Sequence, residues 1–281
     1  MLTALLEDKR VYARDVEKGQ VYSCPGCSAA LILRKGRVRI HHFAHPPPVS
    51  CAWEIGETLV HLEAKLALKE ALEPRCHRSE LEWPVPSLEG DRRADVFIWE
   101  MLGGQIAFEL QHTSIATEEI ERRTCAYMAA GVAVMWLPFL HARYRTLARK
   151  THRDEPGDWV IERYRPKPFE RWLSAFNFGE VWYWATRTQR FMRGTFEPDL
   201  TVVSTLGWQN AFGESPLVSA STASPFVTLR LDGPFDPAAL SIRSARRKPA
   251  SLGRYKLPGG PMARLSSPAR GSEPKLKDRL L

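Results

Sequence analysis

Two strand-like runs on either side of a glycine turn constrain the fold of this chain most strongly. The runs are DRRADVFIWE, residues 91–100, and QIAFELQ, residues 105–111, and both are rich in apolar residues that favour strands. The MLGG segment between them can join two antiparallel strands directly. The pattern predicts a β-hairpin whose turn is centred near Leu102.

The segments around this hairpin predict the rest of a core. A leucine-rich periodic pattern predicts a helix over about 57–72, and LEWPVP predicts a strand at 81–86. A second helix is predicted over about 117–130, and the apolar run VAVMWLPFL at 132–140 is typical of a buried strand. The order helix, strand, strand, strand, helix, strand predicts an α/β fold whose central mixed sheet is flanked by helices.

Acidic residues lie at the end of the hairpin away from its turn. Asp95 and Glu109 are symmetric about Leu102, so we expect them to be cross-strand neighbours. Gln111 follows Glu109 by two residues and shares its strand face. Polar groups among apolar neighbours are costly unless they are used. Two carboxylates suit Mg²⁺ or Mn²⁺, which predicts a metal-dependent phosphodiester hydrolase in which Gln111 orients the water or the phosphate.

The two predicted helices carry further candidates. Glu57, His61 and Lys65 are four residues apart and share a helix face that could complete the metal site or hold a phosphate. Arg123 and Tyr127 are neighbours on the second helix and could contact a phosphate.

Structural alternatives stay open for each of these groups. A solvated stripe around a partly buried histidine also explains the first helix face, and surface stacking also explains the Arg–Tyr pair. The acid pair could equally be held at the sheet edge by Arg92 or Arg93.

A cluster of cysteines and histidines marks the N-terminal part. In a reducing compartment such a pattern indicates a metal site rather than disulfides. Thiolate and imidazole ligands suit a closed, structural, tetrahedral zinc site. The competing interpretation is a plain turn with incidental cysteines. The preferred ligands are Cys24, Cys27, His45 and Cys51, with His42 as the alternative to His45.

Four parts follow from these patterns. They are a zinc-finger-like module of short strands at 1–52, the α/β core at 53–145, an aromatic and basic region at 146–210, and a low-complexity, basic, disordered tail at 211–281. The net charge of +8 lies almost wholly in the tail, since Ser241–Leu281 hold eleven Lys or Arg residues and two acids. The overall basicity therefore does not predict a basic groove on the folded part.

The chain carries no sign of a membrane or export segment. It has no run of about 18 apolar residues. Near the N-terminus the charges follow the apolar residues, and the apolar stretch of a signal peptide is missing. We expect a cytoplasmic protein without a membrane partner.

The ordered motifs of this chain resemble those of the competence protein CoiA-like family. They are CPGC, RKGRVRIHHFAH, GETLVHLEAK, RRADVF, AFELQHTSI and RRTCAYMAAGVAVMWLP, and they cover about residues 11–137. The resemblance implies the PD-(D/E)XK nuclease superfamily, with a zinc-finger-like N-terminus and a restriction-endonuclease-like core. It implies DNA as the partner and, in some members, proteins of DNA uptake or recombination.

The resemblance also assigns roles residue by residue. Asp95 matches the motif aspartate, and Glu109 matches the glutamate of the E-x-K element. Gln111 replaces the usual lysine of that element, and a neutral amide supplies less charge stabilisation. Glu57 and His61 match a helix motif in which related nucleases place a histidine near the metal.

These assignments lead to a Mg²⁺- or Mn²⁺-dependent DNA nuclease. Arg123 and Tyr127 resemble a Q-x-x-x-Y helix element, with arginine in place of glutamine, and with Lys65 they are the candidate nucleic-acid contacts. The alternative is a non-catalytic nucleic-acid-binding protein on a nuclease scaffold, which binds through its zinc module and basic tail. A third possibility is an adaptor that acts through its C-terminal region.

Overall fold

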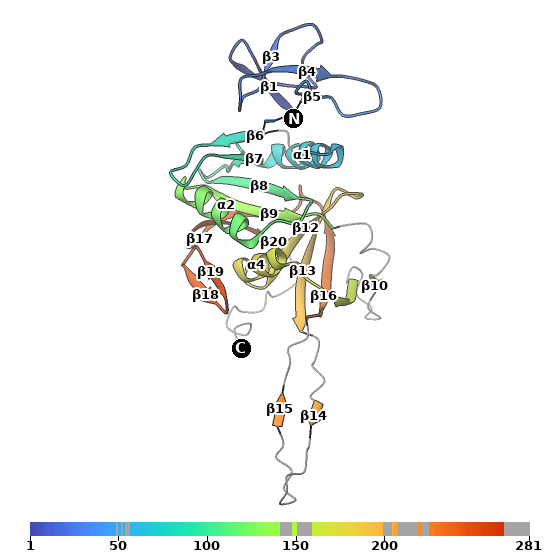
Figure 1. Ribbon diagram of the computed structural model, residues 1–281, viewed down its shortest axis with the longest axis vertical. Coiled ribbons are helices and arrows are strands. Elements are labelled where there is room, and N and C mark those ends of the chain that lie inside the picture. The colour runs from blue at the N-terminus through green and yellow to red at the C-terminus, as the bar shows by residue number, and fades with distance from the viewer. Residues whose placement is uncertain are drawn as a thin grey trace, which may run out of the picture.

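The predicted hairpin forms the middle of a six-stranded mixed sheet in the computed structural model (Figure 1). Strands β7 (Arg92–Trp99) and β8 (Gln105–Gln111) are antiparallel, and Val96 pairs with Phe108. This is the register expected for a turn centred on Leu102, so the hairpin prediction is confirmed.

The structure describes most of the chain. The described residues are 1–48, 50–51, 53, 57–140, 148–150, 159–198, 204–206, 218–220 and 225–266.

Strands on both sides complete the central sheet, whose order is β17-β20-β9-β8-β7-β6. Neighbours β8 and β9 are parallel, as are β9 and β20, and the other pairs are antiparallel. The mixed sheet expected from the element order is therefore confirmed. The added strands are β6 (Arg78–Val85), β9 (Ala133–Pro138), β17 (Ser241–Arg247) and β20 (Gly260–Ser266).

Two helices cover opposite faces of this sheet. They are α1 (Leu59–Leu72) and α2 (Thr117–Ala129), close to their predicted bounds. Successive strand residues point to opposite faces, so Phe108 joins the buried leucines of α1, while Ala107 joins Tyr127 of α2. The candidate site is thus built on a sheet that is covered on both sides.

The N-terminal module is a separate five-stranded sheet that lies above α1 and β6 in Figure 1. Arg10 joins it to the core by donating to the carbonyls of Leu81 and Glu82, each at 2.6 Å. The strand order is β2-β1-β3-β4-β5. The bounds are β1 (Thr3–Leu6), β2 (Lys9–Tyr12), β3 (Tyr22–Ser23), β4 (Ala30–Arg34) and β5 (His42–Ala44).

A second five-stranded sheet, with helix α4 (Pro168–Phe176), follows the core in the chain. Its aromatic side chains are buried, including Trp172 and Tyr183. It meets the central sheet where the Leu140 amide donates to the Trp184 carbonyl at 2.8 Å. The order is β10-β11-β16-β13-β12, with β10 (Arg149–Lys150), β11 (Trp159–Tyr164), β12 (Glu180–Ala185), β13 (Arg190–Pro198) and β16 (Val227–Phe235).

The short remaining elements are η1 and two hairpins. Their bounds are η1 (Glu73–Arg75), β14 (Ser204–Leu206) with β15 (Val218–Ala220), and β18 (Ala250–Leu252) with β19 (Tyr255–Leu257). Among the helices of the described residues, none is long and apolar enough to cross a membrane.

The prediction of a disordered tail is wrong for residues 225–266. They supply β16 to the second sheet and β17 and β20 to the central sheet, so the predicted boundary at 145 does not separate two independent cores. The basic composition of β17 is accommodated because it is an edge strand, where charged side chains reach water. Arg247 is the exception: it is buried, and its guanidinium lies 5.1 Å from the ring of Phe176. The rest of the predicted tail, including 267–281, lies outside the described residues apart from β15.

Candidate functional site

Asp95 lies where strands β7 and β8 separate. Their paired register ends at Val96 and Phe108, and one residue further the Leu110 amide donates to Asp95 Oδ2 at 2.9 Å. The carboxylate therefore takes the place of a backbone acceptor and ends the ladder. Asp95 is 6% exposed and Glu109 is 3% exposed, so two acids from adjacent strands are buried at this end of the hairpin.

Helix α1 brings His61 and Lys65 to Asp95. The Thr58 hydroxyl caps the helix by accepting the His61 amide at 3.3 Å. His61 Nε2 lies 3.1 Å from Asp95 Oδ2, and Lys65 Nζ lies 3.7 Å from Asp95 Oδ1. The predicted face of Glu57, His61 and Lys65 thus points into the protein at Asp95, and the solvated-stripe interpretation is wrong.

Lys65 is the centre of a buried charge network. Its ammonium donates to Glu57 Oε1 and, at 2.7 Å, to Glu82 Oε1. Burial acts to lower the pKa of Lys65, but the carboxylates around it, with Glu82 the strongest, raise that pKa above its ordinary value. Burial likewise opposes ionisation of Asp95, yet His61 and Lys65 hold its pKa well below the usual range. Both groups are therefore charged at neutral pH.

Glu109 points to the opposite face, toward α2. Arg123 Nη2 donates to Glu109 Oε2 at 2.5 Å, and the Tyr127 hydroxyl donates to Glu109 Oε1. Burial raises the pKa of Glu109, Arg123 lowers it, and the nearby negative charge of Asp95 raises it again. The net result is a raised pKa. The ionised form of Glu109 would therefore be stabilised by a further positive charge nearby, such as a bound cation.

Gln111 donates its hydrogen bonds to Thr113 and not to the acid pair. Its amide nitrogen donates to the Thr113 carbonyl at 2.9 Å. The neighbouring His112 lies closer to the site, because its ring stacks on His61 with centroids 5.1 Å apart. His112 was not among the predicted residues, although it directly follows the E-x-Q element.

Sequence reasoning also missed Glu82 and underestimated Arg93. Glu82 is fully buried on β6 and has φ of 52°, a backbone conformation that is uncommon outside glycine. No sequence signal marks this residue, since its partner Lys65 lies on another element. Arg93 donates to the Trp53 carbonyl at 2.6 Å, and its pKa is raised, against the effect of burial, by Glu82 and other acids.

Two predicted nucleic-acid contacts are corrected by their burial. Lys65 and Tyr127 have no exposed side-chain surface, so neither can touch a phosphate in this conformation. They hold the carboxylates of Glu82 and Glu109 instead. Arg123 is different, because a quarter of its side chain is exposed beside Glu109.

The predicted cysteine and histidine cluster is assembled in the N-terminal module. One ligand atom from each of Cys24, Cys27, His45 and Cys51 lies within 4.8 Å of all the others. Cys24 Sγ and Cys51 Sγ are 3.8 Å apart, and Cys27 Sγ and His45 Nε2 are 3.2 Å apart. Tetrahedral bonds of about 2.3 Å to sulfur place two thiolates about 3.8 Å apart, so this donor set fits a metal such as zinc.

The thiols of the cluster differ in their surroundings. Burial raises the pKa of Cys24 to about 12, and the Ala29 amide lowers the pKa of Cys27 to about 7. His42, the alternative ligand, is not part of the cluster, since its Nδ1 lies 2.9 Å from the Ile40 carbonyl and its ring belongs to another surface. The preferred ligand set is therefore the one that the structure brings together.

Two family models match successive parts of the chain. The model of the competence protein CoiA N-terminal domain matches residues 5–54, and that of the competence protein CoiA nuclease-like domain matches residues 57–177. Competence protein CoiA of Bacillus subtilis (strain 168) is 29% identical over 121 residues, which are 43% of this chain and 32% of that protein. The chain thus spans about a third of the length of this curated relative. No solved structure matches it.

Fold and site together define a nuclease-like α/β protein with an N-terminal module that can hold a metal. The chain belongs to the competence protein CoiA-like family. The match to the nuclease-like domain covers residues 57–177, which include Asp95 and Glu109.

Proposed function

We propose that this protein cleaves DNA phosphodiester bonds with the help of Mg²⁺ or Mn²⁺ held by Asp95 and Glu109. The proposal is supported by one observation above all: two buried carboxylates from adjacent strands, Asp95 and Glu109, lie at the end of the hairpin where β7 and β8 separate. Carboxylate oxygens are typical ligands of Mg²⁺.

The surrounding residues suit this chemistry. A divalent cation would polarise the phosphoryl oxygen and activate water. His61 orients the Asp95 carboxylate from α1, as groups behind metal ligands commonly do. Arg123 is partly exposed and lies at Glu109, where it would attract the phosphate that approaches the acid pair.

Two further assignments belong to the same proposal. The order of α1, three antiparallel strands, α2 and the parallel strand β9 supports a restriction-endonuclease-like core of the PD-(D/E)XK type. The ligand set of Cys24, Cys27, His45 and Cys51 supports structural zinc, because four protein ligands leave no open coordination position.

A cleavage assay tests the proposal. The protein is incubated with single- and double-stranded DNA, with Mg²⁺ or Mn²⁺, beside the variants Asp95→Asn and Glu109→Gln. We expect each variant to lose more than about 100-fold in rate, because removal of a residue behind a metal ligand alone costs about 10–100-fold.

Glu170→Gln is the matched control for this assay. Glu170 is also 3% exposed, but it accepts hydrogen bonds from Tyr164 and Tyr183 in the second sheet. Its removal disturbs a buried acid without touching the acid pair, so cleavage should persist. Wild-type protein that never cleaves DNA under any of these conditions contradicts the proposal.

One observation favours the non-catalytic alternative. Each carboxylate of the pair already has a cationic partner, Lys65 for Asp95 and Arg123 for Glu109, and Gln111 supplies no charge. On this alternative the protein binds DNA and does not cut it. Binding without cleavage, with Asp95→Asn binding as tightly as wild type, is the result that would establish it.

A further inference from the structure

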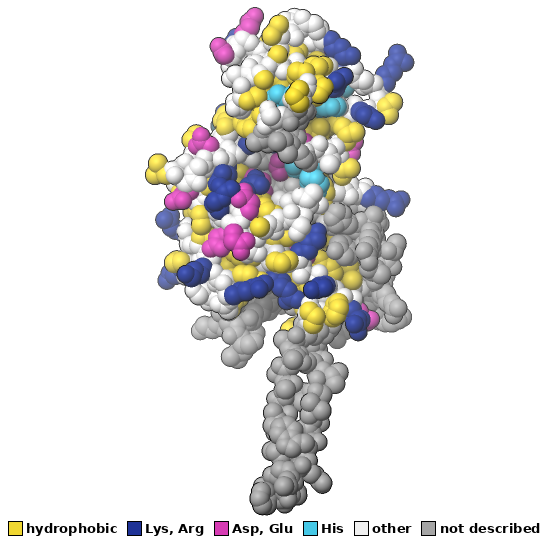
Figure 2. Space-filling model, in the orientation of Figure 1, with side chains coloured by type: hydrophobic (Ala, Val, Ile, Leu, Met, Phe, Trp, Pro, Cys, Tyr) yellow, Lys and Arg dark blue, Asp and Glu magenta, His cyan; other side chains and the backbone are white. Residues whose placement is uncertain are grey.

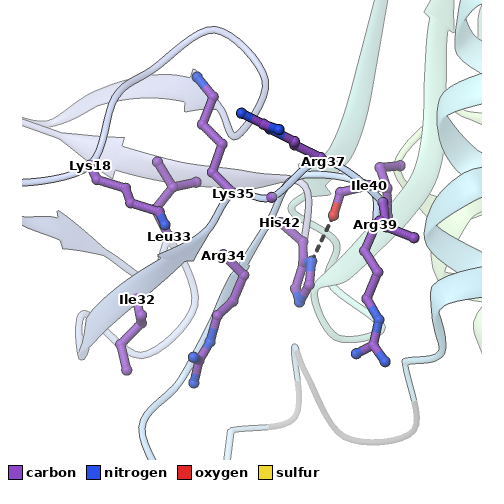
Figure 3. A pocket seen from close by; sticks show the side chains of 11 residues that line it. Lys18, Ile32, Leu33, Arg34, Lys35, Arg37, Arg39, Ile40 and His42 are labelled. Carbon is purple, nitrogen blue, oxygen red and sulfur yellow. Dashed lines mark hydrogen bonds between the residues drawn. The ribbon is translucent and has the colours of Figure 1, made fainter.

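A hollow on the N-terminal module is lined by cations and by no acid. It has a volume of about 700 Å³ and is bordered by strand β4, the loop that follows it, and β5. Figure 3 shows the basic side chains around it. The cations are Lys18, Arg34, Lys35, Arg37 and Arg39.

The sequence around this hollow is free of negative charge. No Asp or Glu occurs between Glu17 and Glu54, a stretch that includes all five cations of the hollow. The charge of the module is therefore one-sided, although the chain before its basic C-terminal part is nearly neutral overall. A local field of this kind attracts polyanions.

The cations of the loop do not serve the stability of the module. Arg34, Arg37 and Arg39 are exposed, and within the described residues no carboxylate pairs with them. Lys35 is the exception, since its ammonium lies 2.9 Å from Glu17 Oε1. Val38 between the two arginines is 96% exposed, so the loop also holds an apolar side chain in water. Unpaired charge kept in this way is typical of a binding surface.

Three basic side chains line one side of the hollow. Arg34 on β4 pairs in register with His42 on β5, and cross-strand neighbours share a face. In Figure 3, Arg34, His42 and Arg39 extend in the same direction from the strand and the loop. The His42 ring is fixed by its contact with the Ile40 carbonyl.

The loop is attached to the core beside the candidate site. Ile40, which ends the basic loop, packs into the buried cluster that holds Leu66 and other leucines of α1. The same helix carries His61 and Lys65, which contact Asp95. In Figure 2, blue side chains gather on the right of the module, and histidines lie at its junction with the core. A strand bound in the hollow would therefore run next to α1.

We propose that this hollow binds the phosphate backbone of a nucleic-acid strand through Arg34, Arg39 and their neighbouring cations. The proposal rests on the proposed function for its choice of DNA as the substrate. Its contacts are to phosphate and carry no base specificity, because flexible exposed arginines offer charge without a fixed geometry. A concave surface suits a strand, whereas a flat lipid headgroup layer would meet only its rim.

Fluorescence anisotropy of a labelled single-stranded oligonucleotide tests the surface. The protein with and without Arg34→Gln/Arg39→Gln is titrated over a range of salt concentrations. Every protein also carries Glu109→Gln, and no divalent metal is added, so that no cleavage occurs. The loss of two phosphate contacts should make the slope of log affinity against log salt shallower by about 1.4. Extrapolated from about 1 M salt, this difference weakens binding roughly 25-fold at about 0.1 M salt. The matched control is Arg243→Gln/Arg246→Gln, which removes two exposed charges from edge strand β17.

The outcomes separate this surface from the proposed function. A larger loss in the loop variant than in the control supports the surface, even if the wild type never cleaves DNA. Equal losses of DNA affinity in the two variants overturn it. A protein that cleaves DNA but whose DNA affinity is unchanged by Arg34→Gln/Arg39→Gln overturns it as well. Loss of binding to phosphatidylserine vesicles without loss of DNA binding would assign the surface to a membrane and overturn the proposal as well. Circular dichroism and bound zinc show that the variants fold.

Discussion

At the scale of single residues, Lys65 is where burial and charge meet most closely. Its ammonium has no exposed surface and contacts Glu57 and Glu82 directly. Taking a charge out of water is costly, and here that cost is offset only because the partners are close and hydrogen-bonded. Glu57, Glu82 and Asp95 therefore share the charge of this one lysine.

We predict that Lys65→Met destabilises the protein by about 3–5 kcal/mol, because it leaves Glu82 buried without its cation. The free energy of unfolding in urea measures the change. Lys69→Met is the control on the same helix: Lys69 is also buried, but its partner Glu73 is half exposed, so its loss leaves no buried carboxylate without a cation and should destabilise the protein less. Addition of Glu82→Gln to Lys65→Met should recover part of the loss. Equal effects of the two single lysine changes would show that Lys65 has no special role.

Asp95 makes stability depend on pH in acid. Its pKa is lowered below the ordinary 3.8, despite burial, by His61 and Lys65. An acid with a lowered folded-state pKa contributes stability that is full above 3.8 and is lost as the pH falls toward the lowered value. We expect the free energy of unfolding to fall more steeply for wild type than for Asp95→Asn between about pH 4 and about pH 2. The exposed Asp91→Asn should follow the wild-type curve, and a parallel curve for Asp95→Asn would contradict the prediction.

The residues of the site divide into those that sequence can predict and those that it cannot. The register of one hairpin, which symmetry about its turn determines, places Asp95 and Glu109 at the same end of that hairpin, although their side chains turn to opposite faces. Lys65 and Glu82 meet through the rotation of α1 against β6, and no local pattern reports that rotation. The four-residue spacing correctly placed Glu57, His61 and Lys65 on one side of α1. It did not show whether that side points to the core or to water, because both give the same spacing.

At the scale of elements, β17 and β20 change the meaning of the basic C-terminal region. Composition predicted disorder there because few of these residues are apolar. An edge strand needs few, since its outer side faces water, while β20 buries Met262, Ala263 and Leu265 beside β9. The helices and strands from α1 to β9 were predictable because their apolar periodicity is complete within each segment.

This arrangement predicts different effects for two truncations. A chain that ends at Leu240 lacks β17 and β20, so it exposes the edge of β9 and gives up at least about 3 kcal/mol for Met262 and Leu265 alone. A chain that ends at Ser266 keeps both strands and should unfold at the wild-type temperature, as followed by circular dichroism. Equal midpoints for the two truncated chains would contradict the placement of β20. Truncation after Leu240 therefore removes part of the folded core and not only a tail. A test of whether the tail binds DNA should use the chain that ends at Ser266.

At the scale of the whole molecule, Glu82 connects the N-terminal module to the charge network around Asp95. Glu82, which binds Lys65 in the core, also accepts the amides of Leu2 at 3.0 Å and Thr3 at 3.1 Å from the module. Arg10 reaches back to the carbonyl of Glu82. The module thus donates three hydrogen bonds to one buried carboxylate, counting the one from the Thr3 hydroxyl at 2.7 Å. We therefore expect unfolding of the module to weaken the hydrogen bonds that hold Glu82, and with them the packing around Lys65 and Asp95.

We therefore predict that loss of the metal destabilises the core as well as the module. Cys24→Ser/Cys51→Ser should lose one equivalent of zinc by elemental analysis, and its core should unfold at a lower temperature. A structural zinc site is worth about 10–16 kcal/mol in isolated fingers, so only a fraction of that coupling suffices to disturb Glu82. Cys76→Ser/Cys125→Ser removes two cysteines outside the cluster and should keep both the zinc and the midpoint. Tryptophan fluorescence follows the core through the buried Trp136, Trp172 and Trp184 when Trp53, which packs in the module, is replaced by Phe in every variant compared. An unchanged core transition after zinc loss would mean that the hydrogen bonds to Glu82 form without help from the metal.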